Sequence, residues 1–117
     1  MHDPEAFLPL KPQTLEILLA LAREDLHGYA ILKVLEERGV RLAASLLYRK
    51  LRRLMEDGLV AESSGRRAPE DDARRRYYRL TPLGREVVAA EAARIVGLAR
   101  SGPIRRLARE AAEGGRG

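Results

Sequence analysis

The stretch from residue 45 to residue 60, SLLYRKLRRLMEDGLV, constrains the fold more than any other part of the chain. At 100° per residue, one face of a helix over this stretch carries only apolar side chains, namely Leu47, Leu51, Leu54 and Met55. Gly58 follows as a helix stop signal. The opposite face and its flanks carry Ser45, Leu46, Arg49, Lys50, Arg52 and Arg53. Such a helix must bury its leucines, and its cations either remain in water or meet an anion.

Further helices are predicted on both sides of this one. Residues 12–23 have helical apolar spacing, and residues 28–39 form a second helix that Gly39 ends. Two antiparallel strands fit LVAESS and RRRYYRL, with a long charged loop between them. Thr81 and Pro82 then start a long helix as N-cap and first helical residue, and residues after the Gly102-Pro103 break can add two turns.

This order predicts a mainly α fold with a small β-wing. Three helices plus a two-stranded hairpin make a winged helix-turn-helix, in which the third helix enters the major groove of DNA and the hairpin lies along the backbone. We expect a winged-helix DNA-binding domain with an extended N-terminal arm over residues 1–80. A C-terminal dimerisation helix over 81–101 and a short helical extension with a tail over 102–117 would follow.

The positive charge of the chain is concentrated in its middle third. Residues 41–80 hold 11 basic and 6 acidic side chains, an excess equal to the whole net charge of +5, whereas residues 1–40 hold 4 and 7. This asymmetry favours a basic face directed at an anion. No cysteine, signal peptide or membrane-length apolar run occurs, so we expect a cytoplasmic protein without membrane contact. No catalytic or metal-ligand constellation is recognisable, which predicts a non-enzyme without cofactor or metal.

Six segments, in order and spacing, resemble the PadR family of bacterial transcriptional regulators. They are FLPL (7–10), ILLALA (17–22), LHGYAI (26–31), LYRKLRRL (47–54), DGLV (57–60) and DDARRRYYRLTPLGREVVAAEAAR (71–94). The resemblance implies a winged-helix homodimer, held largely by the C-terminal helix, that binds a palindromic operator. It also implies repression that a small-molecule effector commonly relieves.

The chain departs from the family pattern just before the predicted third helix. Family members usually show a Ser-Pro-Gly-Thr-like stretch, and this chain reads Ala43-Ala44-Ser45-Leu46. The expected N-cap hydroxyl and helix-starting proline are missing. Leu46 either contacts a thymine methyl group or weakens DNA binding, and the sequence leaves both open.

The predicted contacts to double-stranded DNA lie on three elements. Arg49 and Arg53 are assigned to base edges or phosphates, with Lys50 and Arg52 on the backbone. Tyr48 is open between core packing and a phosphate contact, and Tyr29 can reach a phosphate at the start of the second helix. In the wing, either Arg66, Arg67 and Arg74 lie near phosphates, or the basic and acidic side chains of the loop neutralise each other. His27 has no partners for a metal or catalytic site, which favours a structural role at the turn.

The long C-terminal helix shows two apolar stripes about 120° apart. One carries Leu83, Val87, Ala90 and Leu98, and the other carries Val88, Ala92, Ile95 and Ala99. Glu91 and Arg94 separate the stripes and can pair. One stripe can cover the domain and the other requires a partner, so we expect a homodimer. The alternative function is a winged-helix module that binds protein. The operator, the effector, the sign of regulation and the role of residues 103–117 cannot be read from the sequence.

Overall fold

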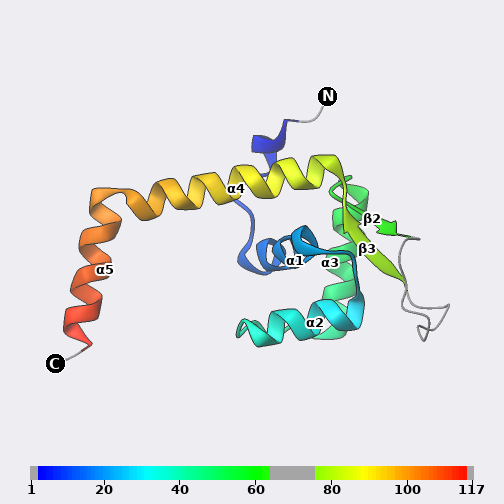
Figure 1. Ribbon diagram of the computed structural model, residues 1–117, viewed down its shortest axis with the longest axis horizontal. Helices are drawn as coiled ribbons and strands as arrows, with labels where there is room; N and C mark the ends of the chain where they lie inside the picture. Colours follow the sequence, from blue (N-terminus) through cyan, green and yellow to red (C-terminus); the bar gives the residue numbers. More distant parts are fainter. Residues whose placement is uncertain (1–2, 64–75, 116–117) are drawn as a thin grey trace.

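The computed structural model describes residues 3–63 and 76–115. Its elements run in chain order, with a 3-10 helix η1 at the start of the arm (Figure 1). They are η1 (Pro4–Phe7), α1 (Pro12–Arg23), β1 (Leu26–His27), α2 (Gly28–Glu37), α3 (Ala44–Glu56), β2 (Val60–Ser63), β3 (Tyr77–Leu80), α4 (Pro82–Arg100) and α5 (Gly102–Gly114). The predicted succession of three helices, a hairpin and a long helix is confirmed.

The sheet has one strand more than the sequence predicted. Its order is β1-β3-β2 and all pairs are antiparallel, with Leu26 opposite Tyr78 and Val60 opposite Leu80. The two residues of β1 were predicted as part of a connector, because a strand this short shows no periodicity of its own. By pairing with β3, β1 joins the base of the hairpin to the start of α2.

The core forms where α1, α2 and α3 meet the sheet. The predicted apolar face of α3 is confirmed, since Leu47, Leu51 and Leu54 are buried and Met55 is half-buried. Side chains from every neighbouring element complete this core, including Ile17, Leu18, Leu21, Ile31, Leu35, Leu59, Tyr78, Leu80, Val87 and Val88. Burial of the leucine face fixes which side of α3 remains in solvent.

Several predicted helix ends have the expected local chemistry. The Thr81 hydroxyl accepts a hydrogen bond from the Gly84 N–H at 3.0 Å and donates one to the Gly58 carbonyl at 2.6 Å. His27 is structural, as predicted, because its Nδ1 accepts the Ala30 N–H at 3.2 Å and so caps α2. Gly58 has a φ of +78°, in the left-handed region that favours glycine. Ala43 makes no side-chain cap for α3, in agreement with the missing hydroxyl.

The division of α4 into two stripes was wrong. Val87 and Val88, assigned to different stripes, are both buried in the core of their own chain, and Glu91 between them is buried as well. From Ala92 to Arg100 every residue is exposed. The domain therefore covers a single broad face along the first half of α4, and the second half of the helix leaves the domain. Leu83 packs against the core and is also covered within the chain.

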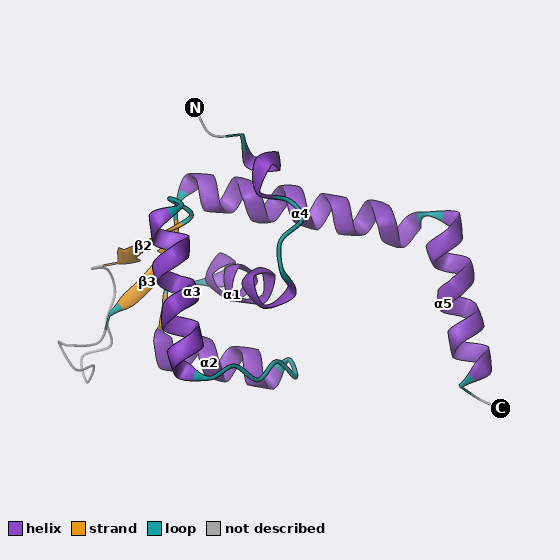
Figure 2. Ribbon diagram, turned by 180° about the vertical axis from the view of Figure 1, so that it is seen from behind, coloured by secondary structure: helices purple, strands orange, loops and turns teal. Residues whose placement is uncertain are grey.

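Glu91 lies on the buried face because it holds the N-terminal arm. One carboxylate oxygen, Oε2, accepts the Leu10 N–H at 2.7 Å, and the other accepts a hydrogen bond from Arg94, the predicted partner. The arm passes over α4 at this point (Figures 1 and 2). The hydrogen bond from Arg94, and then the one from Leu10, lower the pKa of Glu91, against the opposing effect of burial.

A pH dependence of stability follows from this lowered pKa. Because Glu91 is ionised more readily in the folded chain, its stabilisation is complete above its unfolded pKa and is lost as the pH falls through its folded pKa. We expect Glu91→Gln to be less stable than wild type in urea unfolding at pH 7, with a difference that shrinks below about pH 4. A difference that stays constant from pH 7 to pH 3 would contradict the prediction.

The C-terminal part of the chain extends away from the core. The second half of α4 projects beyond the helices of the domain, and α5 turns sharply from its end (Figures 1 and 2). All residues of α5 are exposed, including Ile104 and Leu107. This helix is longer than the two predicted turns. No helix in the described ranges is long and apolar enough to cross a membrane.

Candidate nucleic-acid interface

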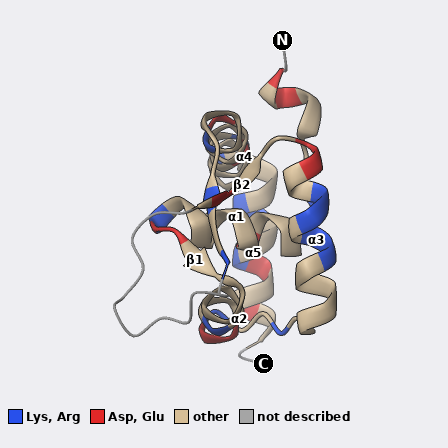
Figure 3. Cartoon of the chain, turned by 90° about the vertical axis from the view of Figure 1, so that its right-hand side faces the viewer, with Lys and Arg blue, Asp and Glu red and all other residues tan. Residues whose placement is uncertain are grey.

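The solvent side of α3 is a cationic surface. Arg49, Arg52 and Arg53 are exposed and Lys50 is half-buried. In Figure 3 the basic positions colour much of the α3 ribbon blue. Ser45 is exposed and Leu46 half-buried near the helix start. The leucines on the inner side cannot turn outward without opening the core, so the rotation of α3 about its axis is fixed. The structure therefore brings all six predicted α3 residues to the helix sides that lie away from the core.

Within the described residues, most of these cations have no ion-pair partner. Arg53 faces Asp57 at 3.4 Å, an exposed pair of small energetic value. In the described part of the chain, no ion pair is found for Arg49, Lys50 or Arg52. Unpaired guanidinium and ammonium groups on one helix side favour a polyanion, because each contact with a phosphate releases a condensed counterion.

Tyr48 lies on the flank of α3 that meets α2. Its ring crosses the first residue of α2, where a Cβ built on Gly28 would lie 2.3 Å from the Tyr48 hydroxyl oxygen. With 47% of its surface exposed, Tyr48 is outside the buried core. The absence of a side chain at Gly28 allows this close approach of α2 and α3, with the Tyr48 hydroxyl against the start of α2.

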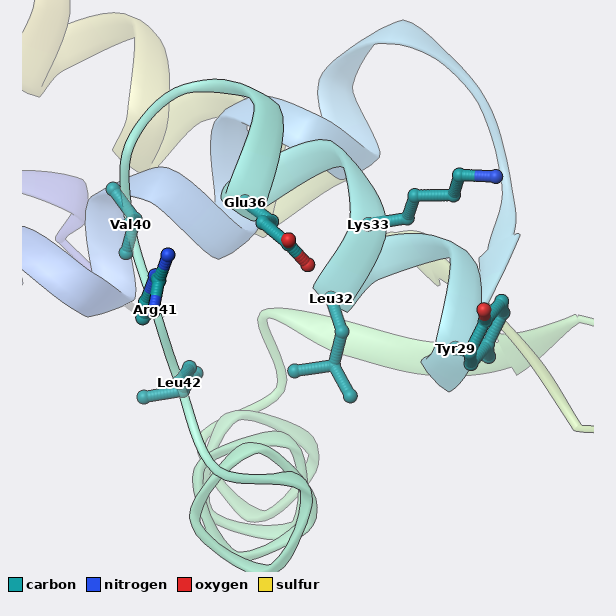
Figure 4. A pocket seen from close by; sticks show the side chains of 7 residues that line it. All are labelled: Tyr29, Leu32, Lys33, Glu36, Val40, Arg41 and Leu42. Atoms are coloured by element: carbon teal, nitrogen blue, oxygen red, sulfur yellow. The ribbon is translucent and has the colours of Figure 1, made fainter.

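Tyr29 marks the exposed start of α2. It is 69% exposed, and its ring stacks against His27 with the centroids 6.4 Å apart. Beside Tyr29, residues of α2 and of the loop before α3 line an open hollow of about 450 Å³ (Figure 4). Lys33 and Arg41 line this hollow and have no ion pair within the described residues. Neither cation was predicted as a site residue, because each is a single cation outside the predicted recognition helix.

The base of the wing is held firmly in the core. Of the two tyrosines in β3, Tyr78 packs inward. Burial is the main cause that raises the pKa of Tyr78. The nearby Tyr48 and Glu62 raise this pKa further, and Arg76 lowers it. Arg76 faces Glu62 at 3.4 Å on the exposed side of the hairpin. The predicted wing contacts Arg66, Arg67 and Arg74 lie outside the described residues.

These features describe a binding surface. Among the described residues, no group of three or more His, Cys, Asp or Glu side chains is placed to hold a metal ion. What the surface offers is a rigid helix with cations, a serine hydroxyl and one leucine on its outer side. That combination can neutralise phosphates and contact base edges.

Two solved structures illustrate the architectures to which this chain is similar. The complex structure of hsRosR-S4, from the RosR protein of H. salinarum, has a TM-score of 0.69 and 25% sequence identity, covering 97% of this chain and 97% of that chain. A PadR-like transcription factor from Bacteroides fragilis has a TM-score of 0.63 and 26% identity, covering 74% of this chain and 82% of the other.

A relative and a family model match at the level of sequence. An uncharacterized 37.1 kDa protein in transposon TN4556 of Streptomyces fradiae is 43% identical over 77 residues, or 65% of this chain. The chain spans only 21% of that relative's length. The model of the transcriptional regulator PadR-like family matches residues 17–90, from the core of α1 to the first half of α4. Because this match includes more than half of the 117 residues, the chain belongs to the transcriptional regulator PadR-like family.

Proposed function

We propose that this protein is a homodimeric transcriptional repressor that binds an inverted-repeat DNA operator through α3. The observation that carries the proposal is the outer side of α3. There Arg49, Lys50 and Arg52 have no ion-pair partner among residues 3–63 and 76–115, while the inner side is buried in the core. A fixed helix with free cations can lie in the major groove and hold one register on the duplex. Residues 1–80 would form the DNA-binding unit.

Each element of the surface then has a role in recognition. Arg49 and Arg53 lie on the edge that would face bases, with Ser45 and Leu46 near the helix start. Lys50, Arg52, Tyr29 and Tyr48 would contact the phosphate backbone from the two flanks of α3. The wing cations Arg66, Arg67 and Arg74 would reach neighbouring phosphates or the minor groove. Arg53 would exchange its weak contact with Asp57 for DNA.

The dimer would form through the exposed half of α4. Ala92, Ile95, Leu98 and Ala99 are all exposed, whereas Leu83, Val87 and Val88 are covered by their own chain and are left out of the interface. The exposed C-terminal half of the segment 81–101 would thus join two subunits about a two-fold axis. Two α3 helices about 34 Å apart would read an inverted repeat. Bound at a promoter, the dimer would obstruct polymerase, and a small-molecule effector would relieve repression by favouring another separation of the helices.

The test is fluorescence anisotropy of the purified protein with a duplex from its own upstream region. A scrambled duplex of equal composition serves as the comparison, and both are titrated over a series of salt concentrations. If each subunit neutralises about four phosphates, the logarithm of the dimer's binding constant plotted against the logarithm of the salt concentration has a slope of about −7. Equal and weak affinity for both duplexes, or no binding at low salt, would contradict the proposal and point to a protein partner.

Substitution of Arg49 distinguishes sequence recognition from general attraction. We expect Arg49→Ala to cost about 1–3 kcal/mol of binding free energy per subunit on the native duplex, and less on the scrambled one, because it removes a base contact. The matched control is Arg109→Ala on exposed α5, which removes the same charge. Equal losses on both duplexes would place Arg49 on phosphate and not on a base.

A further inference from the structure

The two flanks of α3 have different neighbours. Tyr48 on one flank meets Gly28 at the start of α2. On the other flank, Lys50 and Arg53 line an open hollow of about 300 Å³ together with Lys11 and Thr14 from the arm and the first turn of α1. A helix in the major groove has a phosphate backbone on each side, so both flanks need something that contacts phosphate.

The hollow on the second flank has an excess of positive charge. Lys11, Lys50 and Arg53 line it together with a single carboxylate, that of Asp57, which leaves two positive charges over. Within the described ranges, neither Lys11 nor Lys50 makes an ion pair or a side-chain hydrogen bond. The cations that line this hollow repel each other. An anion bound between them is attracted to each cation and offsets that repulsion.

A contact outside the hollow holds the backbone next to Lys11. The N–H of the preceding residue, Leu10, donates to buried Glu91 on α4 at 2.7 Å. Phe7, Pro9 and Leu10 line the same hollow, and the flanking Leu54 and Leu59 are buried. The arm therefore runs along the hollow, and Lys11, which is exposed, lines it together with Lys50 and Arg53 of α3.

We propose that Lys11, with Lys50, binds a backbone phosphate of the DNA strand that borders the arm side of α3. This inference rests on the proposed DNA binding and deepens it. It adds the N-terminal arm to the protein–DNA interface, through a residue that precedes the helix-turn-helix in the chain. Glu91 acts in this arrangement as a positioning residue, because it holds the backbone next to Lys11.

The experiment compares salt dependence among three full-length variants whose fold and oligomeric state match wild type. Loss of one phosphate contact per subunit should lower the magnitude of the slope of log K against log salt by about 1 per subunit, or about 2 per dimer. We expect this change for Lys11→Gln, on native and scrambled duplexes alike, and a wild-type slope for Lys11→Arg, which keeps the charge. Arg109→Gln on exposed α5, with the same charge loss far from α3, should leave the slope nearly unchanged.

Two negative outcomes are separable. If wild type binds DNA with a steep salt dependence and Lys11→Gln behaves like Arg109→Gln, the assignment of Lys11 is overturned while the DNA-binding function stands. If wild type shows no salt-dependent preference for the native duplex, the proposed function fails first, and the role of Lys11 fails with it.

Discussion

Gly84→Ala is expected to destabilise the protein by about 3 kcal/mol, a large part of the stability of an ordinary domain. A Cβ at Gly84 would lie 2.0 Å from the Leu59 carbonyl oxygen, which is backbone and cannot rotate away. The same carbonyl accepts the Thr81 N–H at 3.0 Å, so a shift that relieved the clash would break the junction between β2 and α4. Chemical denaturation followed by circular dichroism measures the loss.

The matched control for this substitution lies on the same helix. A Cβ built at Gly97 meets nothing within 4 Å, and the residue is exposed. Gly97→Ala should therefore raise the free energy of unfolding by about 0.5–1 kcal/mol, the ordinary gain from replacing glycine inside a helix. Opposite signs for the two substitutions would identify steric contact with Leu59 as the cause. Similar effects would show that α4 can move away from β2 at little cost.

Leu98→Glu is expected to separate the proposed dimer and to lower operator affinity by a factor on the order of 10² or more. Leu98 is 48% exposed in the single chain, so the domain itself should fold normally. In a two-fold interface the substitution would place two unpaired carboxylates in an apolar contact, which is strongly unfavourable. A separated subunit loses the high effective concentration that the first bound half-site gives to the second.

Sedimentation velocity and anisotropy on the same samples test this expectation. Gly97→Glu is the control, because it adds the same charge one residue away and points about 100° around the helix. We expect the control to stay dimeric and to bind DNA nearly as wild type does. A Leu98→Glu variant that remains dimeric would show that the exposed half of α4 does not hold the subunits together, and Ile104 and Leu107 of α5 would be the next residues to substitute.

Local patterns predicted much of this fold because the residues that form each pattern are close in sequence. The apolar spacing of α3 placed four side chains on one face, and the structure buries the three leucines and half-buries Met55, with the cations outward. Thr81 followed by Pro82 predicted the start of α4 to the residue. The resemblance in six segments predicted the family, and the match over residues 17–90 confirms it.

Patterns that depend on distant residues were missed or misread. The strand β1 exists because Leu26 and His27 pair with two residues about fifty positions later, and two residues alone carry no period. Glu91 looked like a polar divider between two stripes, since a carboxylate is rarely placed on a buried face. It is buried because the Leu10 N–H and Arg94 satisfy both of its oxygens.

The sequence by itself determined which elements form and which side of α3 carries positive charge, because helical periodicity and capping act over a few residues. Only the tertiary structure decided which charges remain without a partner and where they gather. Lys11 and Lys50 are almost forty residues apart, and they line one hollow because Glu91 holds the arm against α4. Such a contact depends on the packing of three separate elements, for which no local sequence signal exists.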